Sequence, residues 1–214
     1  MKRAIALTAA AVAALSLAAC NKAENAADKA GDTAANMNPG QTAPVNAVQD
    51  AAAAPVGQMS AATMGSHDTG AFVSNAAMGN MYEIEAGKMA QQRAKSADVK
   101  AFGKMMVTDH TALMNEMKPL AQAAGQTPPT ELDQRRKGML DNLKAASDAD
   151  FDKVYLTQQQ AAHEETLTLM NGYAQNGDDA GLKAAAGKAA PKVQAHLDRV
   201  RALQGGGAGA SGHH

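Results

Sequence analysis

The sequence is poor in aromatic residues and has a single cysteine. Tryptophan is absent, and tyrosine and phenylalanine each occur three times in 214 residues. The 13 methionines must therefore supply much of the volume of any core, since methionine fills irregular gaps in packed interiors. Because Cys20 is the only cysteine, no disulfide can form within the chain.

Two further absences limit the functions that the sequence supports. The formal net charge is −1, so no basic excess indicates nucleic-acid binding. Arrangements typical of a catalytic nucleophile or a phosphate-binding loop are also missing. The sequence identifies no class of enzyme, and whether the chain is an enzyme stays open.

The N-terminal residues have the pattern of a bacterial lipoprotein signal. Lys2 and Arg3 precede an apolar run over residues 4–19, and Leu17 to Cys20 form a lipobox. A run of about 15 apolar residues is short for a transmembrane helix, which needs about 20. We therefore expect residues 1–19 to be a signal peptide.

The lipobox predicts that Cys20 is the lipid-bearing first residue of the mature chain. This places the protein on the periplasmic side of the cell envelope, with the membrane as its partner. Asn21 after the cysteine favours the outer membrane over the inner one. The alternative is an ordinary signal peptide with an incidental cysteine.

Composition predicts three regions after the leader. Residues 20–69 are rich in Ala, Asn, Gly, Pro and Thr without sustained periodicity, which predicts a lipid-anchored, disordered tether. Residues 70–204 are long enough for one helical domain. Residues 205–214 are predicted to be a flexible tail.

Apolar periodicity predicts an all-α fold. Ser96 is a predicted N-cap, and Pro191 predicts a bend or a brief interruption of the last helix. Short connections make an up-and-down four-helix bundle, with a short extra helix between helices two and three. The four long helices are predicted over approximately 71–95, 97–123, 147–176 and 179–204, and the short one over 130–145.

The three histidines of the predicted domain fall on three different helices. His163 and His196 lie on apolar stripes, and His110 lies in or at the edge of one. A rise of 1.5 Å per residue puts Glu83 and His110 about 19 and 21 Å from their shared turn. The same measure puts His163 and His196 about 21 and 28 Å from theirs. The heights of His163 and His196 differ by about one turn, which a bend at Pro191 could partly absorb. One layer of the bundle is therefore expected to hold three imidazoles and one carboxylate.

Such a layer has the chemistry of a metal site. An apolar environment disfavours imidazolium and leaves nitrogen lone pairs available to a cation. We predict one transition-metal ion, zinc, copper, nickel or iron, bound by His110, His163, His196 and Glu83. The alternative is three separate core histidines, each hydrogen bonded to a neighbour.

Two carboxylates are secondary candidates for this site. Glu85 lies about 200° from Glu83 around the helix, and Asp109 could orient an imidazole by accepting its N–H. For Asp109 a solvated position is the competing interpretation.

Methionine pairs give a different candidate site. Met78 with Met81, and Met114 with Met117, have the one-turn spacing that presents two thioethers to Cu(I). Flexible core filling is the competing interpretation.

Several short elements together resemble a known bacterial family. The set is similar to the envelope proteins grouped as domain of unknown function 4142, a ferritin-like family, over nearly the whole predicted domain. The elements are Tyr82-Glu83-Ile84-Glu85, Met106-Val107-Thr108-Asp109-His110, Phe151-Asp152, His163, and Pro191 followed by His196-Leu197.

The resemblance implies a ferritin-like bundle and no established activity. Di-iron members of the wider ferritin-like group use Glu-x-x-His pairs. Here Val107, Gln160 and Val193 stand three residues before the histidines. Di-iron oxidase chemistry is therefore disfavoured, and a single-metal site is the simpler expectation.

The leading hypothesis is a lipid-anchored bundle that binds one transition metal for storage, buffering or stress protection. A metal-free structural or protein-interaction module of the envelope is the second hypothesis. Sequestration of Cu(I) by the methionine pairs is the third. The sequence leaves open a homodimer or an envelope protein as a further partner.

Overall fold

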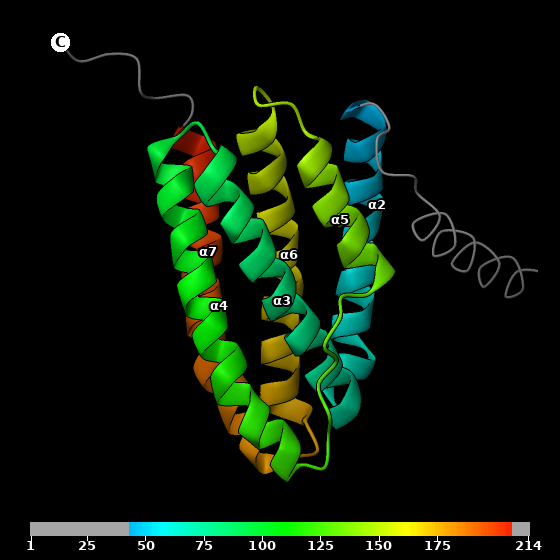
Figure 1. Ribbon diagram of the computed structural model, residues 1–214. Helices are drawn as coiled ribbons and strands as arrows, with labels where there is room; N and C mark the ends of the chain where they lie inside the picture. The colour runs from blue at the N-terminus through cyan, green and yellow to red at the C-terminus, as the bar shows by residue number, and fades with distance from the viewer. Residues whose placement is uncertain (1–42, 207–214) are drawn as a thin grey trace, which may run out of the picture.

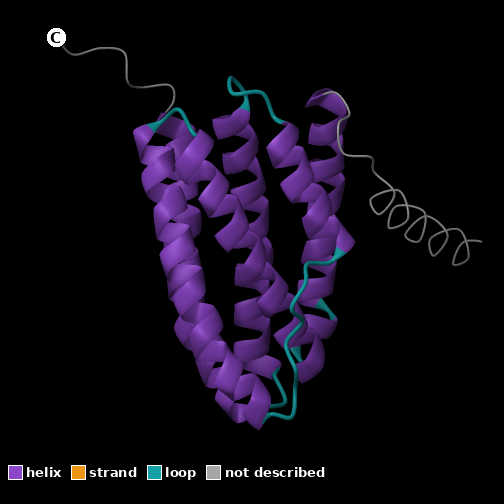
Figure 2. Cartoon of the chain, in the orientation of Figure 1, coloured by secondary structure: helices purple, strands orange, loops and turns teal. Residues whose placement is uncertain are grey.

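The computed structural model describes residues 43–206, and all regular structure in this range is helical (Figure 2). The predicted all-α class is therefore confirmed. The predicted signal peptide over 1–19, Cys20 and residues 207–214 lie outside the described range. The elements are α2 (Ala43–Ala62), the 3₁₀ helix η1 (Met64–Ser66), α3 (Thr69–Arg93), α4 (Ala97–Ala123), α5 (Gln134–Ala145), α6 (Phe151–Asn176) and α7 (Ala180–Gly206).

Side-chain caps determine where several helices begin. The side chain of Ser96 accepts a hydrogen bond from the backbone N–H of Val99, as predicted for the start of α4. The helix α5 begins later than expected, because Asp133 accepts from the backbone N–H of Arg136 at 2.7 Å. Its carboxylate therefore caps the first turn, and the helix does not begin at residue 130 as predicted.

The four long helices form two hairpins. Short connections at residues 94–96 and 177–179 join α3 to α4 and α6 to α7 (Figure 1). Contacts between α3 and α6 and between α4 and α7 join the hairpins around one interior. Within the first hairpin, Gly87 and Gly103 allow a close approach, since a Cβ atom on Gly87 would lie 2.7 Å from the carbonyl oxygen of Gly103.

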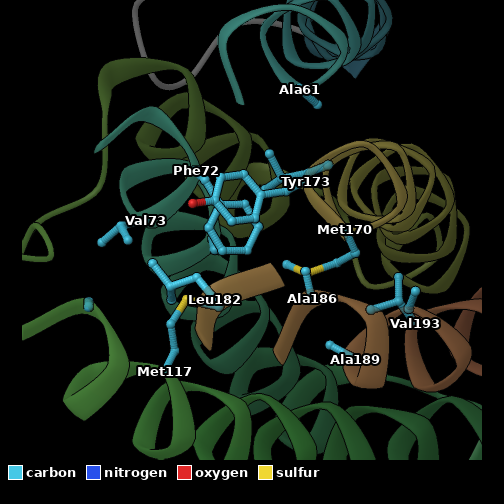
Figure 3. Packing of buried hydrophobic residues seen from close by; sticks show 14 residues of the cluster. Ala61, Phe72, Val73, Met117, Met170, Tyr173, Leu182, Ala186, Ala189 and Val193 are labelled. Carbon is cyan, nitrogen blue, oxygen red and sulfur yellow. The ribbon is translucent and has the colours of Figure 1, made fainter. Parts of the chain in front are cut away.

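The interior consists of two apolar clusters. In the first, the rings of Phe72 and Tyr173 stack with centroids 3.9 Å apart (Figure 3). Other members of that cluster are Met117, Leu169, Leu182 and Val193, whereas the second cluster includes Phe102, Met106, Leu143, Phe151, Tyr155, Leu156 and Val200.

The helix α2 corrects the expected tether. Residues 20–69 were expected to be disordered, but α2 and η1 are helical within this range, and α2 packs on α5 and α6. Apolar periodicity missed α2 because polar groups hold it in place: the carboxylate of Asp50 accepts from Asn142 at 2.9 Å and from Gln158 at 2.6 Å.

The last helix differs from expectation in one respect. Pro191 lies inside α7, which runs without interruption from Ala180 to Gly206, so two residues of the expected tail are helical. None of the described helices is long and apolar enough to cross a membrane.

Candidate metal centre

A layer of three imidazoles lies between the two apolar clusters. His110 of α4, His163 of α6 and His196 of α7 are 1%, 1% and 2% exposed. Their ring centroids are 5.4 to 5.7 Å apart. One nitrogen from each ring lies within 4.8 Å of the other two, so the structure brings the three predicted histidines together. The apolar residues that flank them are Met106 and Met117 on α4, Leu156 and Leu169 on α6, and Val193 and Val200 on α7.

Two of the rings are held by uncharged oxygen atoms. The Nδ1 atom of His110 lies 2.8 Å from Oδ1 of Asn80 on α3. The Nδ1 atom of His163 lies 2.8 Å from the backbone carbonyl oxygen of Gln159, one turn earlier on α6. Because these oxygens accept hydrogen bonds, Nδ1 carries the proton in each ring.

The third ring is held by a carboxylate. The Nε2 atom of His196 lies 2.9 Å from Oδ2 of Asp109, and the other oxygen of Asp109 lies 3.6 Å from Nζ of Lys192. Asp109 therefore orients an imidazole, as the sequence suggested, but that imidazole belongs to α7. A carboxylate in this position fixes the tautomer and makes the ring a stronger metal ligand.

Each ring keeps one nitrogen without a partner among residues 43–206. Nε2 of His110, Nε2 of His163 and Nδ1 of His196 are buried and make no hydrogen bond. Because the opposite nitrogen of each ring donates its proton to an oxygen, these three atoms present lone pairs. Three buried lone pairs on rings whose centroids are 5.4 to 5.7 Å apart form a set of donors suited to a cation.

Burial keeps the three rings neutral. It is the main cause that lowers the pKa of His163 from 6.5 to about 3, and the neighbouring His196 lowers it further. Burial also lowers the pKa of His110 well below 6.5. For His196, burial lowers the pKa and the hydrogen bond to Asp109 opposes it. Neutral imidazoles are the form that binds a metal.

Glu83, the fourth predicted ligand, is buried beside His163 but outside the three-nitrogen group. Its Oε1 lies 3.6 Å from Nδ1 of His163, the nitrogen that also faces the carbonyl of Gln159. Its Oε2 accepts a hydrogen bond from Nε2 of Gln159 at 2.6 Å. Burial raises the pKa of Glu83 from 4.5 to about 8, against the lowering effect of the Gln159 hydrogen bond.

Glu85 is not part of this layer. Its side chain is half exposed and pairs with Lys88 at 2.7 Å on the surface of α3.

Three of the four candidate methionines lie together elsewhere. Met81, Met114 and Met117 line a cavity of about 400 Å³, which Asn80 also lines. Met78 is not among the lining residues. The one-turn pairing of Met78 with Met81 therefore does not describe this cavity, although the pair Met114 and Met117 does.

Sequence reasoning missed two residues that organise the layer. Asn80 lies three residues before Glu83 and Gln159 lies four residues before His163, so each shares a helix face with a residue that was identified. That spacing was the available signal. Neither residue type is a usual metal ligand, and their role appears only when the rings they hold are located.

Comparison with known proteins gives one result. The model of a family described as Domain of unknown function (DUF4142) matches residues 53–203, a range that contains the three histidines of the layer. No significant match was found among the curated proteins or among the solved structures.

Proposed function

Since the chain belongs to the family described as Domain of unknown function (DUF4142), whose description names no activity, we propose a function from the buried site. The protein binds one transition-metal ion through Nε2 of His110, Nε2 of His163 and Nδ1 of His196. The ligands project into a ferritin-like four-helix bundle made by α3, α4, α6 and α7.

The observation that carries this proposal is the set of three buried nitrogen atoms without hydrogen-bond partners. A buried polar atom without a partner is costly, so native structures contain few of them. One cation would satisfy all three. Zinc-to-nitrogen bonds of 2.0–2.1 Å in a tetrahedral shell put ligand nitrogens roughly 3.4 Å apart, so nitrogens within 4.8 Å of one another need only a small inward movement.

The ligand set is compatible with several metals. Three imidazoles suit zinc, copper, nickel or iron, and they leave one position of a tetrahedral shell open. Because no second group of ligands for a di-iron centre accompanies the three rings in residues 43–206, we propose storage, buffering or stress protection in place of oxidase chemistry.

The direct test is metal stoichiometry. Protein purified without a histidine tag is loaded with Zn²⁺, or with Co²⁺ as a spectroscopic probe, and compared with His163→Gln. The control is His67→Ala, because His67 is exposed and outside the layer. We expect one bound ion in the wild type and in the control, and none in His163→Gln.

The competing function is a metal-free structural or interaction module that contacts a second copy or another envelope component. In that case buried water would satisfy the three nitrogens. A wild-type protein that binds no Zn²⁺ or Co²⁺ above background, while remaining folded, would refute the metal proposal and support this module.

A second candidate, Cu(I) binding, is favoured by the shared cavity of Met81, Met114 and Met117. Thioether ligands select Cu(I) over harder ions. If this candidate is right, His163→Gln retains Cu(I), whereas replacing Met81 and Met114 with leucine removes it. Met89→Leu is the control, because Met89 packs against the other apolar cluster. Core filling is indicated if the methionine variants bind Cu(I) like the wild type.

We also propose that Cys20 anchors the protein to the periplasmic side of the envelope, in the outer membrane. The support is the basic, apolar and lipobox pattern of the leader. Labelling cells with an alkyne fatty acid should tag the wild type and not Cys20→Ser. Equal labelling of the two would rule out this anchor.

A further inference from the structure

The helix α2 directs its polar residues, together with the small residues Ala53, Gly57 and Ala61, toward the protein, and its other apolar residues toward solvent. Its polar residues, from Asn46 to Ser60, are all buried or half-buried. From residue 45 onward every exposed side chain of α2 is apolar: Val45, Ala47, Val48, Ala51, Ala52, Pro55, Val56, Met59 and Ala62. We call these nine residues the outer face of α2.

Hydrogen bonds determine this orientation. At one end of α2 the carboxylate of Asp50 accepts from Asn142 and Gln158. Further along, Oε1 of Gln58 accepts from the hydroxyl of Thr168 at 2.9 Å. Turning the apolar side inward would break these bonds and leave partly buried polar groups without partners, which is costly. The outer face therefore stays exposed unless something outside the bundle covers it.

The apolar exposure is confined to this region. In the described range, all large hydrophobic side chains that are exposed belong to α2 or η1: Val45, Val48, Val56, Met59 and Met64, at 39% to 68%. Figure 1 shows α2 at one side of the molecule, against α5 and α6, with α4 and α7 on the other side. Concentrated apolar exposure of this kind marks a contact with a membrane or a partner.

We propose that the outer face of α2 lies on the surface of the lipid bilayer. The inference rests on the proposed anchor at Cys20. Residues 21–42 separate that cysteine from α2, and at no more than about 3.6 Å per residue they keep α2 within about 80 Å of the lipid. Among described elements, α2 is the nearest to the anchor along the chain.

The charge of α2 also fits a lipid surface. Asp50 is the only charged residue in Ala43–Ala62, and it faces the protein. Shallow insertion of the outer face would therefore desolvate no charge. Because the face carries no lysine or arginine, the contact should not depend on anionic lipid.

This contact would orient the domain. The side of the molecule that carries α2 would face the membrane, and α4, on the other side in Figure 1, would face away from it. The acyl chains on Cys20 would attach the chain to the membrane, and α2 would fix the orientation of the domain on it.

The test uses the full chain, purified from membranes as the mature lipidated protein and reconstituted in phosphatidylcholine vesicles. Cys20 is the only cysteine and is blocked by lipid, so Val48→Cys carries a single environment-sensitive fluorophore. Val48 is 68% exposed, so the label should not disturb folding. Ala112→Cys, exposed on α4, is the matched control.

We expect the Val48 probe to be quenched by a doxyl-labelled lipid and protected from aqueous iodide, and the Ala112 probe to behave in the opposite way. Adding Val56→Asp and Met59→Asp to Val48→Cys should increase iodide quenching several-fold, with unchanged helical content by circular dichroism.

Three outcomes would overturn the proposal. If the protein floats with the vesicles but iodide reaches both probes equally, the anchor is intact and α2 does not contact lipid. Protection that increases with protein density, without quenching by the doxyl lipid, means that another protein copy covers the face. Protein that does not float at all refutes the anchor and the α2 contact together.

Discussion

Asp109 and His196 are 87 residues apart in sequence, yet Oδ2 of the aspartate lies 2.9 Å from Nε2 of the imidazole. The next residue, His110, presents its own ring to the same layer from α4. One dipeptide therefore supplies a candidate ligand and the group that orients a second ligand on α7. Such a carboxylate–imidazole pair leaves Nδ1 of His196 as the free lone pair.

Asp109→Asn tests this relationship. The amide removes the charge that orients His196, and loss of such a partner typically lowers metal affinity about 10–100-fold. Zn²⁺ affinity would be measured by competition with a chromophoric chelator. Asp98→Asn is the control, because Asp98 is exposed and pairs with Arg199 on the surface, away from the three imidazoles. Equal affinity in wild type and Asp109→Asn would show that this hydrogen bond does not support metal binding.

Metal binding should raise the melting temperature. An ion that binds only the folded state, at 100 times its dissociation constant, adds about 2.7 kcal/mol of stability. For a domain of this size that corresponds to roughly 5–10 °C. The increase, followed by circular dichroism at 222 nm, should disappear with a chelator and in His163→Gln. A melting temperature that responds equally in that variant would locate the stabilising ion elsewhere.

The buried His163 should make the metal-free protein sensitive to acid. Its pKa is about 3 in the folded state against 6.5 for an ordinary histidine, so below pH 6.5 the unfolded state binds the additional proton. Stability present above pH 6.5 is therefore lost progressively as the pH falls toward 3. Urea unfolding at pH 7 and pH 5 should show this loss in the wild type and a smaller one in His163→Gln. Parallel losses in both proteins would contradict the assignment.

Glu83 should act in the opposite direction. Its pKa is raised to about 8 from 4.5, so between these values the folded state binds more protons than the unfolded state. The stability that Glu83 contributes is present below pH 4.5 and is lost as the pH rises through 8. Glu83→Gln, which keeps the shape without the titration, should flatten the decline between pH 6 and pH 9. An unchanged pH profile would mean that the carboxyl is ionised in the folded protein.

Two glycines give a matched test of the packing. A Cβ atom on Gly103 would lie 2.8 Å from the carbonyl oxygen of Gly87 and from Cβ of Ala90, whereas one on Gly138 would meet nothing within 4 Å. Gly103→Ala should lower the free energy of unfolding by about 1–3 kcal/mol. Gly138→Ala, inside α5, should raise it by about 0.5–1 kcal/mol. Denaturant unfolding measures both, and equal effects would mean that α3 and α4 are less closely packed.

Much of the helical organisation could be predicted because its causes are local. The predicted range 97–123 coincides with α4, since the Ser96 cap, the apolar repeat and Gly125 all act within a few residues. Gly125 has φ 72°, a conformation that glycine adopts readily after a helix. Similar apolar repeats predicted that His163 and His196 face inward and placed His110 in or at the edge of an apolar face.

The helix α2 could not be predicted in this way. Its inward side combines its polar residues with the small residues Ala53, Gly57 and Ala61, and its outward side is apolar. A surface helix is normally identified by the opposite arrangement, with large apolar residues on the inward side. The groups that hold it, such as Asn142 and Thr168, are 92 and 110 residues away from their partners Asp50 and Gln58.

The sequence by itself determined that the described domain is helical, the range of α4, the approximate ranges of α3, α5, α6 and α7, and that His163 and His196 face inward. Those properties depend on backbone hydrogen bonds and side-chain spacing within one or two turns. Only the tertiary structure decided that Asp109 holds His196, that Asn80 holds His110, and that Glu83 stands beside the layer. Such pairings depend on the rotation of each helix about its axis and on its shift along that axis relative to its neighbours. Packing between distant segments sets both.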